Sequence, residues 1–76
     1  MPNGGPNKLR SERARRGWTQ ADLAERADTY QSEISRYENG DLFPDPPTIE
    51  RLAGAFGVTA ETMFRWLREP AAESAA

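Results

Sequence analysis

The hydrophobic residues of this chain fall into short clusters with helical spacing. The clearest cluster lies in 46–56, where Ile49, Leu52, Ala53 and Phe56 recur at i, i+3, i+4 and i+7, which places them on one face of a helix. Similar spacings predict four more helices, over about 8–16, 20–27, 31–38 and 60–68. No stretch alternates between apolar and polar residues over the length of a strand, so the pattern predicts an all-α fold.

Capping residues mark the ends of these helices. Side chains that can accept hydrogen bonds from free amides precede four of them: Asn7, Thr19, Asp45 and Thr59. Residues that tolerate left-handed backbone geometry follow three of them: Gly17, the pair Asn39–Gly40, and Gly57. Residues 1–6 carry two prolines and two glycines with almost no apolar content, and residues 70–76 begin with a proline that should stop any preceding helix. We therefore expect disordered tails at 1–6 and 70–76 around one domain at 7–69.

Composition excludes several classes of protein. A chain of 76 residues without cysteine or histidine has no thiolate nucleophile or zinc–thiolate site and lacks the commonest general base. We expect no enzymatic activity, no metal and no cofactor. The mean hydropathy is −0.83, and neither a long apolar run nor a secretion-signal pattern is present. These features favour a cytoplasmic protein that does not enter a membrane.

The second and third predicted helices are joined by only a few residues, at about 27–30. Two short helices with a tight turn are typical of the helix-turn-helix, whose second helix enters the major groove of DNA. If Ile34 and Tyr37 face inward, Gln31, Ser32, Ser35 and Arg36 face outward. Glutamine suits adenine and arginine suits guanine. The same residues would equally suit an ordinary solvated helix face.

Three motifs support the first interpretation. They are G-W-T-Q-x-x-L-A at 17–24, I-S-R-Y-E-N-G at 34–40 and L-A-x-A-F-G-V at 52–58. In this order and at these separations the sequence resembles the Cro/repressor-type (XRE-like) helix-turn-helix family, over roughly two-thirds to three-quarters of the chain. The resemblance implies a compact five-helix, lambda-repressor-like domain that binds double-stranded DNA.

The resemblance also implies roles for individual residues. It assigns base contacts to the start and middle of the third helix, at Tyr30, Gln31, Ser32 and Arg36. It assigns contacts with the DNA backbone to Gln20 and Asn39. To these we add Ser35, on the outward side of the third helix, and Arg10, in the basic first helix. Arg13 and Glu38 match a basic–acidic pair that ties the first helix to the third. For this pair we expect a structural role rather than DNA reading.

The sequence departs from the family pattern around the third helix. Tyr30 stands where a small capping Ser or Thr is usual, and Thr29 is a candidate to replace that cap. The tyrosine could lie against DNA or fold back onto the core. Glu33 could accept from cytosine or point to water, and we favour water. The loop Asp41–Asp45 has two aspartates and no basic residue, so we expect it to be a poor phosphate clamp.

The net charge of −2 is unevenly distributed along the chain. Residues 8–16 contain Lys8 and four arginines against Glu12 alone, whereas residues 41–76 contain three basic residues against six acidic ones. We expect the basic segment to lie on the DNA side, phosphate contacts to be few, and dimerisation to be needed for useful affinity.

The fifth predicted helix offers a candidate dimer surface. It carries Met63, Phe64, Trp66 and Leu67, more large apolar groups than one face of a short helix buries. We assign Met63 and Leu67 to the core and Phe64 and Trp66 to a homodimer interface, although all four could complete the core. The leading hypothesis is a homodimeric transcriptional regulator, most simply a repressor. The alternatives are an antitoxin with a protein partner, or an adaptor that has lost DNA binding.

Overall fold

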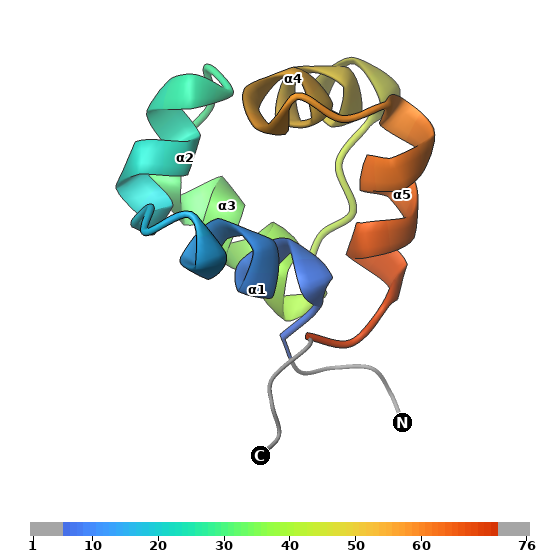
Figure 1. Cartoon of the computed structure of the whole chain (residues 1–76), viewed down its shortest axis with the longest axis horizontal. Helices are drawn as coiled ribbons and strands as arrows, with labels where there is room; N and C mark the ends of the chain where they lie inside the picture. Colours follow the sequence, from blue (N-terminus) through green and yellow to red (C-terminus); the bar gives the residue numbers. More distant parts are fainter. Residues whose placement is uncertain (1–5, 72–76) are drawn as a thin grey trace.

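The computed structural model describes residues 6–71, and five α-helices account for most of them (Figure 1). The helices are α1 (Lys8–Arg15), α2 (Gln20–Arg26), α3 (Gln31–Asn39), α4 (Pro46–Phe56) and α5 (Ala60–Arg68). Within 6–71 the only β-type pairing is an isolated bridge between Asn7 and Pro70. The predicted all-α fold is therefore confirmed. The predicted bounds hold for α4 and α5 and differ by one residue at the ends of the other three.

Each helix contributes a large apolar side chain with no exposure to a single core. These residues are Leu9, Leu23, Ile34, Leu52 and Met63, each with no exposed surface. In Figure 1, α2 and α5 stand on opposite sides of the bundle, α4 lies across its top, and α1 runs in front of α3. The main packing pairs are α4 with α5 and α2 with α3, and α1 packs on both α5 and α3.

The helix starts are held by the predicted side-chain caps. The side chains of Asn7, Thr19, Asp45 and Thr59 each accept a hydrogen bond from a backbone amide in the first turn of the next helix. At α2 the cap is reciprocal, because the Thr19 amide also donates to Asp22, 2.8 Å away. This backbone hydrogen bond, together with the one from the Thr19 hydroxyl, lowers the pKa of the Asp22 carboxyl.

Asn7 has a second role that its position in the sequence does not reveal. Its buried amide nitrogen donates to the carbonyl oxygens of Tyr37 at 2.8 Å and Leu67 at 3.3 Å. One side chain thus joins the start of α1 to α3 and α5. The Ala71 amide also donates to the Pro6 carbonyl at 3.0 Å and Asn7 forms a bridge with Pro70, so the two ends of the described chain lie side by side. The rest of both expected tails, 1–5 and 72–76, lies outside the described residues.

The structure corrects the assignment of Trp66 to a dimer interface. Trp66 is only 7% exposed, because its ring meets Phe56 edge-on at 5.3 Å and the Arg16 guanidinium lies 5.9 Å from its centroid. Met63 and Leu67 are buried, as predicted. Phe64 remains 41% exposed.

No helix within residues 6–71 has the length and apolar character needed to span a membrane.

Candidate nucleic-acid interface

The connection between α2 and α3 is a tight turn. Ala27 caps the end of α2, and Asp28 adopts a left-handed conformation with φ of 58°. The Thr29 amide then donates to the Ala24 carbonyl at 2.9 Å, which closes the turn. Tyr30 is the first residue before α3 and caps it without a side-chain hydrogen bond. The two helices therefore have the connection that a helix-turn-helix requires.

The structure corrects the expectations for Thr29 and Glu33. Tyr30 is the N-cap of α3 and no side chain caps this helix, and the Thr29 hydroxyl instead donates to the Glu33 carboxylate at 2.8 Å. The Tyr37 hydroxyl donates to the same carboxylate oxygen at 3.3 Å. Glu33 is therefore engaged within the protein instead of pointing to water. Burial, reinforced by the negative charge of Glu33, raises the pKa of the Tyr37 phenol.

The remaining face of α3 is open and polar. Ile34, Tyr37 and Glu38 are buried, and the exposed residues of the helix and its N-cap are Tyr30, Gln31, Ser32, Arg36 and Asn39. Ser35 is partly buried on the same side. Tyr30 is 74% exposed, so it does not fold back onto the core. The candidate base-contacting side chains therefore share one accessible surface.

Arg36 is the one cation on this surface. Among residues 6–71 no carboxylate pairs with its guanidinium, and its side chain is exposed. It stands one turn after the exposed first turn of α3, which holds Gln31 and Ser32. An unpaired guanidinium beside polar hydrogen-bonding groups suits recognition of a guanine edge or a phosphate.

A buried ion pair supports α3 from behind. Arg13 of α1 donates through Nε and Nη2 to the two carboxylate oxygens of Glu38, with Nη2 3.0 Å from Oε1. The Gln20 amide nitrogen donates to the same carboxylate at 3.1 Å. The pair implied by the resemblance is present, and it also holds Gln20. The side-chain nitrogen of Gln20 is therefore engaged inside the protein, whereas its side-chain oxygen takes no part in this hydrogen bond.

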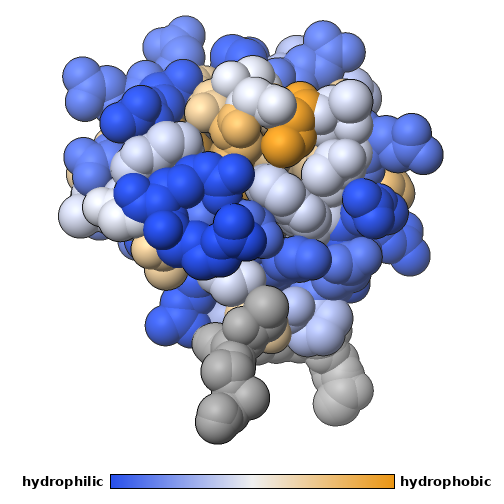
Figure 2. All heavy atoms as spheres, in the orientation of Figure 1, coloured by the Kyte–Doolittle hydropathy of each residue, from blue (hydrophilic) through white to orange (hydrophobic). Residues whose placement is uncertain are grey.

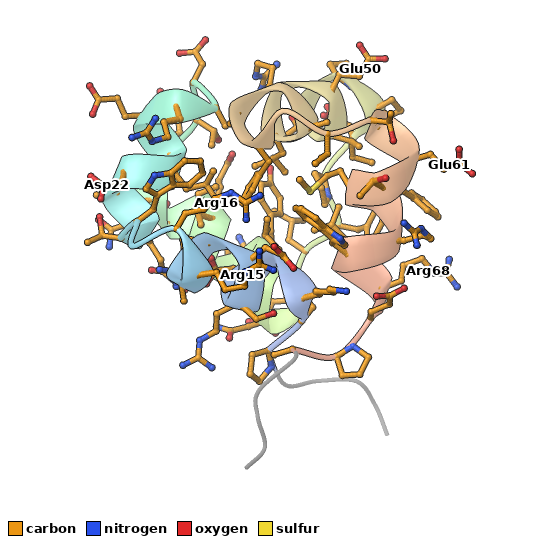
Figure 3. All side chains as sticks on the ribbon, in the orientation of Figure 1. Arg15, Arg16, Asp22, Glu50, Glu61 and Arg68 are labelled. Atoms are coloured by element: carbon orange, nitrogen blue, oxygen red, sulfur yellow. The ribbon has the colours of Figure 1, made fainter. Side chains whose placement is uncertain are left out.

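The basic segment of α1 is less available to DNA than the sequence indicates. Most of its cations are paired with acidic groups of the domain: Lys8 with Glu69, Arg13 with Glu38, and both Arg15 and Arg16 with Glu12. Arg16 also points into the middle of the bundle (Figure 3), with its guanidinium 4.8 Å from the centroid of Phe56. Arg10 is the exposed cation of α1 without a carboxylate partner in the described part of the chain.

Sequence reasoning missed one surface feature near α3. Leu42 and Phe43, in the loop after α3, are 38% and 48% exposed, and the Phe43 ring packs on Phe64 of α5. The sequence could have indicated this surface, because Leu42 and Phe43 are two large apolar residues in the loop between the glycine that ends α3 and the prolines that begin α4. The loop is therefore apolar as well as acidic.

Comparisons with known proteins agree with this geometry. The sequence model of a family described as "Helix-turn-helix domain" matches residues 7–71. The "Competence pilus inhibition repressor" of Acinetobacter baylyi is 41% identical over 56 residues, which are 74% of this chain and 51% of that protein. The chain thus spans about half the length of the curated relative it matches.

A solved structure shows the same fold. The crystal structure of a hypothetical transcription factor, NHTF, from Neisseria superposes with a TM-score of 0.67 at 25% sequence identity, covering 83% of this chain and 82% of that one. The family match extends over nearly all the described residues, and the superposition is that of a small helical domain. The chain therefore belongs to the helix-turn-helix domain family, in its Cro/repressor-type (XRE-like) branch.

Proposed function

We propose that the protein is a sequence-specific transcriptional repressor that binds a two-fold operator as a homodimer, with α3 in the major groove. The observation that carries this proposal is the division of α3 into a buried apolar side and an open side of hydrogen-bonding groups. A recognition helix needs such an open side to reach base edges.

Four residues on the open side are the proposed base contacts. Gln31 and Ser32 begin the helix, where helix-turn-helix proteins concentrate their contacts with bases, and Arg36 follows one turn later. Tyr30 projects just before the helix and is available to a thymine methyl or to the sugar–phosphate backbone. The arrangement supports hydrogen-bonded reading by a small number of side chains.

The proposed contacts with the DNA backbone lie around this group. Asn39 and Arg10 are exposed, and Ser35 and Gln20 are partly exposed. Few cations remain for phosphates, and the loop Asp41–Asp45 adds none. Binding to random DNA should therefore be weak, because non-specific affinity comes almost entirely from phosphate neutralisation. Two half-sites about one helical turn, roughly 34 Å, apart would supply the missing affinity to a dimer.

The repressor assignment rests on one relative and one physical argument. The Acinetobacter relative is described as a repressor, although the chain spans only half of it. A small DNA-binding domain also blocks transcription most simply by occupying a site that the polymerase needs.

The test is selection of bound sequences from a random duplex pool, followed by fluorescence anisotropy on a single half-site. Arg36→Ala should lower affinity by roughly 5- to 150-fold and relax preference at one base pair. Arg15→Ala is the matched control, because it removes an exposed guanidinium of α1 that is already paired with Glu12. Equal losses on selected and random DNA would show that Arg36 does not read bases. Selection of no sequence at all would refute the proposal.

The exposed residues Leu42, Phe43 and Phe64 favour a second candidate function, in which the domain covers a different protein as an antitoxin or adaptor. Co-purification of a second small protein at constant stoichiometry supports an antitoxin. Absence of binding to bulk duplex at about 50 mM salt supports an adaptor, because weak salt screening favours any phosphate contact.

A further inference from the structure

Tyr30 is an exposed aromatic side chain that the rest of the domain does not engage. It is 74% exposed, and within residues 6–71 its side chain makes no hydrogen bond or ring contact. The other exposed aromatic rings, Phe43 and Phe64, pack on each other with centroids 5.4 Å apart. The face over α1 in Figure 2 is mostly hydrophilic, so exposed apolar groups are not spread evenly over the molecule. Packing inside the domain therefore does not account for a tyrosine at position 30.

Hydrogen bonds fix the residue that directly precedes Tyr30. The hydroxyls of Thr29 and Tyr37 both donate to Oε1 of Glu33, at 2.8 Å and 3.3 Å. The Thr29 amide donates to the Ala24 carbonyl at 2.9 Å, so Thr29 is held through its backbone as well as its side chain. Glu33 and Tyr37 lie one turn apart on α3. The peptide that leads into Tyr30 is thus anchored to the body of α3.

Helix α4 completes this set of hydrogen bonds from the other side of the turn. Arg51 donates to the Ala27 carbonyl at 3.1 Å, where α2 ends, and to the Thr48 hydroxyl at 3.2 Å. The Thr48 side chain hydrogen-bonds to the Tyr37 phenol and opposes the rise in pKa that burial and Glu33 cause there. The contacts therefore pass from the end of α2 through α4 and α3 and back to the turn. We call this closed set the turn network; it consists of Ala27, Thr29, Glu33, Tyr37, Thr48 and Arg51.

We propose that Tyr30 reads the 5-methyl group of a pyrimidine in each half-site, and that the turn network, with Glu33 at its centre, positions Tyr30 for this contact. This reading of DNA rests on the proposed function, because it concerns how α3 meets the bases. A recognition helix contacts base edges with its N-terminal residues, and Tyr30 immediately precedes that end of α3. The pyrimidine methyl is the apolar group on the major-groove edge, so it is the group that an exposed aromatic ring can shield from water.

Contact with a methyl group needs more exact placement than contact with a phosphate charge. A gap of only about 0.5–1 Å forfeits a quarter to a half of a van der Waals attraction. The start of α3 has no side-chain cap, and Asp28 in the turn before it has a left-handed φ of 58°. The turn network supplies the rigidity that a cap would otherwise give. Glu33 is therefore a positioning residue, which acts on the base through Thr29 and Tyr30.

Removal of single methyl groups from the DNA tests the reading by Tyr30. The full chain is titrated by fluorescence anisotropy against one selected half-site in which each thymine is replaced in turn by deoxyuridine. One replacement should weaken binding about fourfold, which corresponds to the burial of one methyl group. At the same position 5-methylcytosine should be bound about fourfold more tightly than cytosine, because the methyl group is the sole difference. Tyr30→Ala should abolish both ratios, whereas Tyr30→Phe keeps the ring and should preserve them.

Substitutions in the turn network test the positioning role, with folding checked by circular dichroism. Glu33→Ala should reduce the thymine-to-deoxyuridine ratio to less than about twofold, because the contact loses its exact geometry. Glu33→Gln removes the same charge but keeps an oxygen that accepts from both hydroxyls, so the ratio should be retained. Glu25→Ala is the matched control, because it removes an exposed carboxylate from α2 outside the network. A lower melting temperature in Glu33→Ala with an unchanged ratio would show a purely structural role and overturn the positioning.

The outcomes distinguish failure of methyl reading from failure of the proposed function. If a sequence is selected but none of its methyl groups contributes through Tyr30, methyl reading is overturned and the proposed function is not. Equal losses for Tyr30→Ala on selected and random DNA place the tyrosine at the sugar–phosphate backbone, which also overturns methyl reading alone. If no sequence is selected, the proposed function is refuted and methyl reading is refuted with it.

Discussion

Removing Arg13 while leaving Glu38 in place should severely destabilise the domain. Glu38 is 1% exposed, and its carboxylate accepts two hydrogen bonds from Arg13 and one from Gln20. In Arg13→Met the carboxylate stays buried with only the Gln20 amide as partner. Breaking a buried pair on one side costs about 3–5 kcal/mol. A domain of this size has a total stability of about 4–11 kcal/mol, so much of it would be lost.

The double variant Arg13→Met/Glu38→Met should recover most of that loss. Replacing both members of a buried pair by apolar groups is often close to neutral. Here the Trp18 carbonyl, which accepts from Arg13 at 2.7 Å, and the Gln20 amide still lose partners. We therefore expect a net cost of about 1–2 kcal/mol, from one neutral hydrogen bond lost at each group.

Urea unfolding followed by tryptophan fluorescence measures this cycle, because Trp18 and Trp66 both pack against Phe56 near the core. The four proteins give a coupling free energy that should exceed about 2 kcal/mol. If Arg13→Met costs less than about 1 kcal/mol, or if the double variant costs the sum of the two single changes, the pair does not behave as a buried unit and the reasoning is refuted.

Three further changes probe local features of the same fold. Asp28 holds a left-handed φ of 58°, so Asp28→Gly should raise the free energy of unfolding by about 0.5–1 kcal/mol in a urea titration, and a decrease would contradict this. Asn7→Ala removes two buried donors and an N-cap and should cost about 2–3 kcal/mol in the same assay, whereas a cost below 1 kcal/mol would show that the contacts are dispensable. The pKa of the Asp22 carboxyl lies below its ordinary value of 3.8, so the folded state binds a proton at this carboxyl less readily than the unfolded state does. The stability that results is present above pH 3.8 and is lost as the pH falls below it. Thermal melts of Asp22→Asn should accordingly show a shallower decline between neutral pH and about pH 3, and an unchanged decline would exclude this contribution.

The ends of the helices could be predicted because several local signals coincide. At α4, Asp45 caps the helix, prolines occupy its first turn, and Gly57 ends it in a left-handed conformation. Each of these preferences belongs to the residue itself and needs no knowledge of distant contacts. The one-residue differences at the ends of α1 and α2 arise where the chain leaves the helix gradually, at Arg16 and Ala27. At α3 the left-handed Gly40 ends the helix, and Asn39 still belongs to it.

The partners of individual side chains could not be predicted in the same way. Spacing along α5 left Phe64 and Trp66 equivalent as surface candidates, and the choice between them depends on Phe56 and Arg16 from other helices. We expected Glu33 in water because the outward alternatives were weighed without its partners. Thr29 reaches the Glu33 carboxylate only once the turn before α3 has formed, whereas Tyr37 lies four residues later on α3 itself, a spacing that the sequence does contain. The residues of the open α3 face could be named because burial of Ile34 and Tyr37 fixes the rotation of that helix.

The distribution of paired charges determines how this domain can bind DNA. Four of the five cations in residues 8–16 have carboxylate partners within the domain, so the basic character of that segment stabilises the fold more than it attracts phosphate. Of the cations that the proposed function places at DNA, Arg36 reads a base and Arg10 contacts a phosphate, and one phosphate contact per subunit gives a salt dependence of only about −1 in log affinity against log salt concentration. Electrostatic attraction this small holds one subunit only weakly on random DNA. Under the proposed function, affinity therefore comes mainly from base-edge hydrogen bonds made by two subunits at two half-sites.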